Sequence, residues 1–114
     1  MNSWTVRLTD QAAQDVEAIL EWTLEQFGPL QVDIYTDVIN DALEDLAEGP
    51  ESLGVRWPVE LGKNVAILHV ARNGRKGRHE VVFRVNERAR LIEVLRILHD
   101  SMDLVRHIPP SKAN

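Results

Sequence analysis

Apolar residues recur along the chain with two different spacings, and these spacings predict its elements. Trp4, Val6 and Leu8 alternate with polar residues, which predicts a short, half-buried strand. Two stretches follow in which apolar side chains recur every three or four residues, as in amphipathic helices. The first stripe is Ala12, Val16, Ile19, Leu20, Thr23 and Phe27, and the second is Tyr35, Val38, Ile39, Ala42, Leu43 and Leu46. Thr9 can cap the first helix. Only Gly28-Pro29 separates the two stripes, so we expect an antiparallel helical hairpin.

Three strands are predicted in the second half of the chain. Residues 65–72 and 79–86 are rich in β-branched side chains, and the loop between them contains the Asn-Gly pair that suits a hairpin turn. The apolar run 91–98 is interrupted only by Glu93 and Arg96, which is typical of a central strand covered on at least one face. The order of the elements predicts an α+β domain, in which an N-terminal strand and a helical hairpin precede a three-stranded antiparallel meander.

A polar cluster and a short C-terminal helix are expected after the last strand. Apolar side chains recur at helical spacing over residues 102–108, and Ser101 or Asp100 is placed to cap this helix. Pro109-Pro110 would end it.

Composition narrows the class of protein. A chain of 114 residues predicts a single domain spanning residues 1–114. It has no cysteine, which excludes disulfides and thiolate metal sites. Neither a signal-like start nor an apolar stretch of membrane-spanning length is present, so we expect a cytoplasmic protein without membrane contact. The four histidines, His69, His79, His99 and His107, match no metal-binding motif, and no phosphate-binding loop occurs. We therefore expect neither a metal nor another cofactor.

Charge is distributed unevenly between the two halves of the chain. Residues 1–53 hold twelve acidic residues against one basic residue, Arg7, whereas residues 54–114 hold twelve basic and six acidic residues. The two balances, −11 and +6, sum to the net charge of −5. Either opposite faces of the domain meet different partners, or an acidic helix pair packs on a basic sheet and neutralises it.

Arginines are the candidate binding residues of the basic half. Arg84 and Arg96 alternate with apolar neighbours in predicted strands, so their side chains leave the sheet on the face opposite those neighbours. Such a surface can hold phosphates or a carboxylate-rich peptide through bidentate hydrogen bonds. The alternative is a solvated face whose arginines pair with Glu80, Glu93 and Asp103. Trp57, in the loop before the meander, either packs on the edge of the core or contacts a partner.

Two segments carry a resemblance to a known family. The stretch Ile97-Leu98-His99-Asp100-Ser101-Met102-Asp103 and the run Val-Val-Phe-Arg-Val at residues 81–85, together with the element order and the Gly-Pro break, resemble the ParE branch of the ParE/RelE toxin superfamily. The resemblance implies a toxin of a bacterial type II toxin–antitoxin system. It also implies a cognate, ParD-like antitoxin, whose acidic and apolar tail would order over the basic sheet. The expected partner-binding residues are Trp57, Arg72, Arg84, Arg96, His99, Asp103 and Arg106.

The same resemblance bears on the target. ParE-like members arrest growth by inhibiting DNA gyrase through binding, whereas RelE-like members cleave mRNA on the ribosome. The ribonucleases carry arginines near the positions that Glu80 and the cluster Asp100, Ser101 and Asp103 occupy here. Carboxylates at those positions would repel an RNA backbone. The resemblance thus favours a gyrase inhibitor without catalytic residues.

Two alternatives stay open at this point. One is a ribosome-dependent endoribonuclease that uses His107 as general acid or base, with Arg84 and Arg96 on phosphates. The other is a non-toxic relative that still binds an antitoxin. Direct binding to nucleic acid also stays open.

Overall fold

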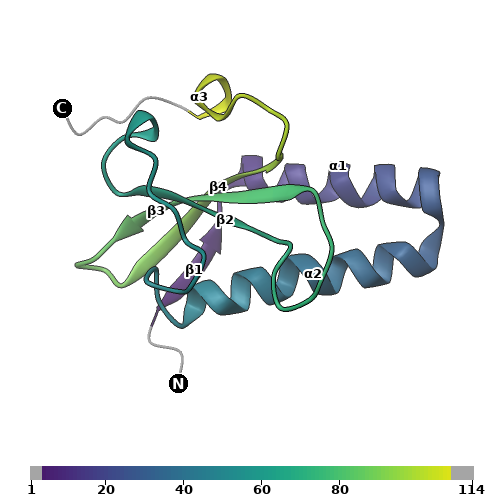
Figure 1. The fold of residues 1–114 in the computed structure, drawn as a ribbon, viewed down its shortest axis with the longest axis horizontal. Coiled ribbons are helices and arrows are strands. Elements are labelled where there is room, and N and C mark those ends of the chain that lie inside the picture. The colour runs from purple at the N-terminus through teal and green to yellow at the C-terminus, as the bar shows by residue number, and fades with distance from the viewer. Residues whose placement is uncertain (1–3, 109–114) are drawn as a thin grey trace.

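The elements follow the predicted order. The computed structural model describes residues 4–108, and the predicted stop at Pro109-Pro110 lies outside them. Figure 1 shows two long helices lying along one side of a sheet. The elements are β1 (Thr5–Leu8), α1 (Asp10–Phe27), α2 (Pro29–Ala47), the 3₁₀ turn η1 (Val59–Leu61), β2 (Val65–His69), β3 (His79–Asn86), β4 (Leu91–His99) and α3 (Leu104–His107). None of the described helices is long and apolar enough to cross a membrane.

Short polar and glycine signals set the limits of the helical hairpin, as predicted. The Thr9 hydroxyl accepts a hydrogen bond from Ala12 N at 3.1 Å and donates one to Leu95 O at 3.1 Å, so the cap of α1 also ties the helix to β4. Gly28 has φ +89°, a conformation that L side chains rarely adopt. Its N–H closes α1 on Leu24 O, and Pro29 begins α2 at once. The antiparallel hairpin follows from this single break (Figure 1).

The sheet has the order β1-β4-β3-β2, which makes β4 an interior strand, as its apolar run predicts. The strands β2, β3 and β4 form the antiparallel meander. The strand β1 pairs parallel to β4, with Val6 opposite Ile92. The sequence pattern predicted no partner for β1, so its parallel pairing with β4 adds to the predicted antiparallel meander.

Both faces of the sheet are apolar, which explains the almost continuous apolar run in β4. Ile92, Val94 and Ile97 lie in the cluster that packs under the two helices, together with Phe83 of β3. Leu95 and Leu98 belong to a second cluster on the other face, which Leu61 of η1, Leu104 and Ile108 complete. The register shifts between Val82 and Phe83 of β3, because Leu95 is an extra residue in β4. We call the face that carries this second cluster the outer face.

Three local predictions were wrong. The strand predicted over residues 65–72 ends at His69, because Arg72 turns toward α2 and binds Asp45 there. The C-terminal helix is capped by Asp103, whose carboxylate accepts from Val105 N at 3.2 Å, and not by Ser101 or Asp100. Phe27 was assigned to the buried stripe of α1, but it is 65% exposed because the helix runs on past the sheet.

Candidate functional site

Three of the four histidines meet at one end of the sheet. The end of β2, the start of β3 and the end of β4 lie together there because the meander folds back on itself (Figure 1). His79 and His99 are directly opposed on β3 and β4, with ring centroids 5.5 Å apart. His69 Nε2 lies 2.9 Å from Asp100 Oδ2, and Arg78 donates to the same carboxylate at 3.3 Å. We call His69, His79, His99 and Asp100 the histidine cluster.

The hydrogen bonds of this cluster assign its protons. Ala71 N donates to Nδ1 of His69 at 3.0 Å, and Ser101 N donates to Nδ1 of His99 at 3.1 Å. An Nδ1 that accepts a hydrogen bond carries no proton, so each of these two rings is a neutral Nε2–H imidazole. The Nε2–H of His69 therefore donates to the Asp100 carboxylate.

Nδ1 of His79 also accepts a hydrogen bond, in this case from a side chain of α2. The Tyr35 hydroxyl accepts from Arg78 N at 3.1 Å and donates to Nδ1 of His79 at 2.6 Å. Burial, followed by the neighbouring His99, lowers the pKa of His79 to about 4. Burial also raises the pKa of the Tyr35 phenol. The hydrogen bond from His69, and then Arg78, hold the pKa of Asp100 below its ordinary value. The hydrogen bonds therefore describe imidazoles that each accept at Nδ1, beside a carboxylate whose ionised form is favoured.

The spacing of the histidines in the sequence matches no metal-binding motif and did not predict that three of them converge. Within residues 4–108, no group of three or more His, Cys, Asp or Glu side chains is arranged to hold a metal ion. Chemically, the cluster offers neutral nitrogens that accept or transfer a proton, next to the exposed guanidinium of Arg78.

Two of the expected partner-binding arginines form ion pairs within the molecule. Arg96 forms a bidentate ion pair with Asp15 of α1, at 2.8 Å from Nε and 2.9 Å from Nη2, and its Nη1 donates to His107 O at 3.3 Å. Arg72 donates to Asp45 of α2 at 2.7 Å and to a loop carbonyl at 2.8 Å. Their side chains are only 20% and 16% exposed. Both guanidinium groups are thus already occupied.

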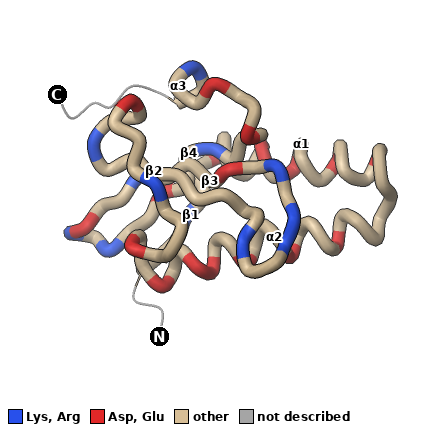
Figure 2. Tube along the Cα trace, viewed as in Figure 1, with Lys and Arg blue, Asp and Glu red and all other residues tan. Residues whose placement is uncertain are grey.

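These contacts decide between the two interpretations of the uneven charge. Arg75 adds a third pair, to Asp41 of α2 at 2.5 Å. Figure 2 shows the basic loop between β2 and β3 beside α2, which carries only acidic charges. In the part of the hairpin nearest the sheet, the carboxylates of the helices are therefore neutralised by arginines of the sheet and its loops.

The other expected residues remain accessible. Arg84 lies on the outer face, opposite Glu93 in the register, and its side chain makes no hydrogen bond or ion pair with any described residue. Trp57 packs edge-to-face on Phe83, with ring centroids 6.4 Å apart, yet stays 45% exposed. Both predictions for Trp57, an anchor and an exposed contact residue, are thus compatible with its position.

The C-terminal members of the expected set gather around α3. Asp103 caps this helix, and the side chain of Arg106 is 82% exposed, 3.8 Å from the Asp103 carboxylate. His107 is exposed on the same turn, and only its backbone carbonyl contacts Arg96. His99 lies apart from them, in the histidine cluster. The structure therefore divides the expected set over the outer face, the α2 side and the sheet end.

Two carboxylates with little exposure, Asp15 and Glu80, have structural roles. Asp15 also accepts from Ile97 N at 2.9 Å, so it closes the edge of β4 beyond the end of β1. Its place between Ala12 and Ile19 in the apolar stripe of α1 was the available signal. Glu80 is 6% exposed and pairs with Arg56. A pair between Glu80 and an arginine was one of the alternatives left open by the sequence, but its partner was not predicted.

Comparisons with known proteins agree with this fold. The family model described as the ParE toxin of the type II toxin–antitoxin system parDE matches residues 6–104. A structure titled as the chromosomal ParDE system of P. aeruginosa is similar, with a TM-score of 0.69 and 21% identity, over 87% of this chain and 98% of that one.

Two further structures share the fold, and no curated protein matches the chain. The RelBE2 toxin–antitoxin complex of Mycobacterium tuberculosis has a TM-score of 0.59 and 22% identity, over 87% and 93% of the two chains. A metal-bound toxin from Helicobacter pylori has a TM-score of 0.52 and 14% identity, over 86% and 96%.

Proposed function

The chain belongs to the ParE toxin family of type II toxin–antitoxin systems, and from this premise we propose that it arrests growth by binding DNA gyrase, without catalysing a reaction. An antitoxin partner follows from the same membership. That this antitoxin is ParD-like, and that both act in the cytoplasm, is part of the proposal.

The proposal rests on the carboxylates at the end of the sheet where the histidine cluster lies. Where ribonuclease relatives are expected to carry arginines, this chain has Glu80, which is buried and paired with Arg56, and Asp100, which is ionised. Arg96, one of the two arginines expected to compensate, is held by Asp15. A phosphodiester at this place would meet negative charge and few free cations. These contacts favour inhibition by binding over cleavage of RNA.

The outer face is the proposed contact surface for the antitoxin tail. Arg84 and Arg106 offer guanidinium groups to carboxylates. Trp57 offers an exposed aromatic edge to the same tail from the loop before β2, where its ring packs on Phe83. An acidic and apolar tail would match this combination of charge and apolar surface. Arg72 and Arg96 are left out of the proposed contact because their guanidinium groups are already bonded.

One observation favours a second candidate function, cleavage of RNA on the ribosome. The histidine cluster places neutral imidazoles beside Arg78, which is a combination that proton transfer to and from an RNA hydroxyl requires. The residues in question are then His79 and His99, and no longer His107, whose side chain has no hydrogen-bond or ion-pair partner among residues 4–108. Growth arrest that persists in His99→Ala, with mRNA intact on the ribosome, would exclude this candidate.

The decisive assay is supercoiling of relaxed plasmid by purified gyrase. We expect the purified chain to inhibit the reaction in a dose-dependent manner, and we expect equimolar antitoxin to restore it. A matched control is Glu17→Gln, an exposed change on α1 that leaves every contact described above in place. Full supercoiling activity at excess toxin, in a preparation that still arrests growth, would refute the gyrase proposal. A preparation that binds the antitoxin and never arrests growth would identify a non-toxic relative.

A further inference from the structure

The helical hairpin ends in an apolar surface that the rest of the chain does not cover. The ends of α1 and α2 that meet at Gly28 project beyond the sheet (Figure 1). We call residues 21–37 the hairpin end. Five large apolar side chains there are between 44% and 73% exposed, namely Trp22, Leu24, Phe27, Leu30 and Ile34. Half of the ten large apolar side chains that are exposed among the described residues thus lie in this one short segment.

The apolar side chains of the hairpin end are partly organised in advance. Trp22 and Phe27 pack edge-to-face, with ring centroids 5.8 Å apart. Such an aromatic pair is a preferred geometry and presents a fixed surface at little further cost in side-chain entropy. Soluble proteins rarely expose several large apolar side chains together unless the surface binds something.

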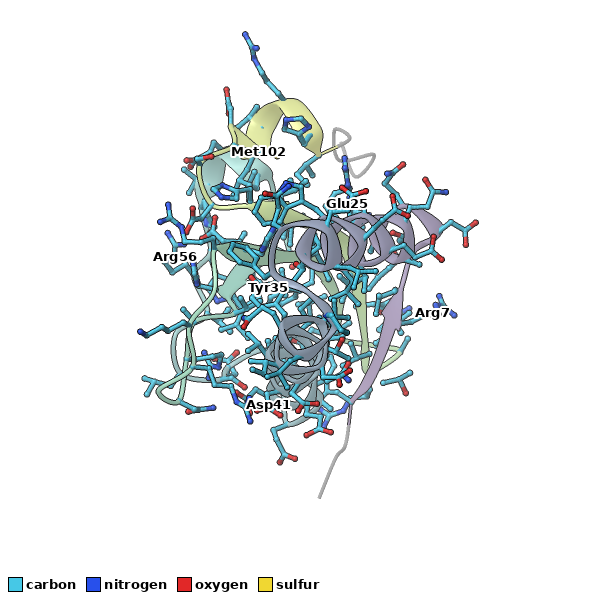
Figure 3. All side chains as sticks on the ribbon, turned by 90° about the vertical axis from the view of Figure 1, so that its right-hand side faces the viewer. Arg7, Glu25, Tyr35, Asp41, Arg56 and Met102 are labelled. Carbon is cyan, nitrogen blue, oxygen red and sulfur yellow. The ribbon has the colours of Figure 1, made fainter. Side chains whose placement is uncertain are left out.

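The charge of the hairpin end indicates what binds there. Glu21, Glu25, Asp33 and Asp37 are exposed, and none of them forms an ion pair with a residue in the described range 4–108. Figure 3 views the molecule from this end, with Glu25 on the side of α1 away from α2. Nearer the sheet the situation is the reverse, because the sheet and its loops neutralise three carboxylates of the same helices.

This charge disfavours a second copy of the hairpin as the occupant. Residues 8–55 contain no lysine or arginine, so two hairpin ends in contact would place like charges together. A segment that combines apolar side chains with lysines or arginines satisfies both properties of the surface. Such a segment would bury the aromatic pair and neutralise the four unpaired carboxylates.

We propose that the hairpin end docks a basic, apolar segment of another polypeptide, separate from the outer face where the acidic antitoxin tail is expected. The apolar side chains of that segment pack on Trp22, Phe27 and Leu30, and its cations face the carboxylates around them. The hairpin packs on the face of the sheet opposite the outer face, so the two partners can be bound at the same time.

A pair of synthetic peptides tests the proposal on the full-length chain. One is a labelled helix of about four turns, with leucine at helical spacing and lysine elsewhere, and its twin carries glutamate in place of lysine. Fluorescence anisotropy at low and high salt measures both affinities. We expect the lysine peptide to bind at least about tenfold more tightly than its twin, and we expect salt to weaken it.

Variants locate the site. Phe27→Ser with Leu30→Ser removes two exposed side chains and should lower the affinity at least about tenfold. The matched control is Leu53→Ser with Val59→Ser, because these side chains are 90% and 91% exposed elsewhere in the chain. The control should bind as the unaltered protein does. Glu25→Gln with Asp33→Asn should lower the affinity for the lysine peptide and should not lower the affinity for the glutamate twin. Circular dichroism verifies that each variant is folded.

Three results would overturn the proposal. The first is equal affinity for the two peptides, which would mean an unselective apolar surface. The second is an equal loss of affinity in the control variant Leu53→Ser with Val59→Ser, which would mean that the peptide binds elsewhere. The third is a concentration-dependent dimer that Phe27→Ser with Leu30→Ser converts to a monomer, because the occupant would then be a second copy of the chain.

Discussion

Replacing Asp15 by alanine tests whether Arg96 is a structural residue and not a free binding residue. Three N–H groups converge on the Asp15 carboxylate, two from the Arg96 guanidinium and one from the Ile97 backbone, at 2.8 to 2.9 Å. The Asp15 side chain is 11% exposed and that of Arg96 is 20% exposed. The change would leave a poorly hydrated guanidinium without its counter-charge and an unpaired N–H at the edge of β4.

The expected loss of stability can be worked out from these contacts. Removing one partner of a buried ion pair costs about 3 to 5 kcal/mol, and this pair belongs near the lower limit because water reaches part of it. We therefore expect Asp15→Ala to lower the free energy of unfolding by about 3 kcal/mol. Asp15→Asn keeps an acceptor for Ile97 N and loses only the charge, so it should cost about half as much.

Urea unfolding measures this loss. With a slope of about 1 to 2 kcal/mol per molar urea, a loss of 3 kcal/mol lowers the midpoint by about 1.5 to 3 M, with the slope unchanged. The matched control is Glu17→Ala, which removes an exposed carboxylate of α1 two residues from Asp15. It should change the free energy of unfolding by less than about 0.5 kcal/mol. A loss below about 1 kcal/mol for Asp15→Ala, or full additivity with Arg96→Ala, would refute the reasoning.

Three further changes test other contacts of the structure. The pKa of His79 is about 4 in the folded chain and 6.5 in the unfolded chain, so the unfolded state binds more protons between these two values. We therefore expect the free energy of unfolding to fall by about 1 to 2 kcal/mol from pH 7 to pH 4.5, after allowance for the partial exposure of the ring. His79→Gln should flatten this decline in urea titrations at several pH values, and the exposed control His107→Gln should leave it as steep as before. Tyr35→Phe removes the hydroxyl between Arg78 N and His79 and should cost about 1 to 2 kcal/mol by the same measurement, whereas a neutral effect would contradict the assigned hydrogen bonds. Gly77→Ala should cost about 1 to 3 kcal/mol, since its Cβ would lie 2.6 Å from Val70 Cγ2, and a melting temperature equal to that of the unaltered protein would show that the loop adjusts freely.

The sequence predicted those parts of the fold that depend on local chemistry. Gly28-Pro29 marks the turn of the hairpin, Thr9 caps α1, and the apolar run of β4 indicates a central strand covered on at least one face. The partner of β1 could not be predicted, because its pairing with β4 joins residues 86 positions apart, Thr5 and Leu91 among them. No local pattern encodes a contact of that range.

The candidate site was harder to predict because it depends on register. His79 and His99 become neighbours only when β3 and β4 pair as they do, with the irregularity at Val82 and Phe83 included. The internal role of Arg96 likewise depends on Asp15, from a helix at the other end of the sequence. Residue types indicated an arginine-rich surface, and tertiary contacts decided which arginines remain available on it.

The central claim is that this chain arrests growth at gyrase and not at the ribosome. The most direct measurement follows incorporation of labelled thymidine and labelled methionine after the chain is induced without its antitoxin. We predict that DNA synthesis falls first, while protein synthesis continues and mRNA stays intact. Protein synthesis that stops first, with mRNA cleaved on the ribosome, would contradict this account.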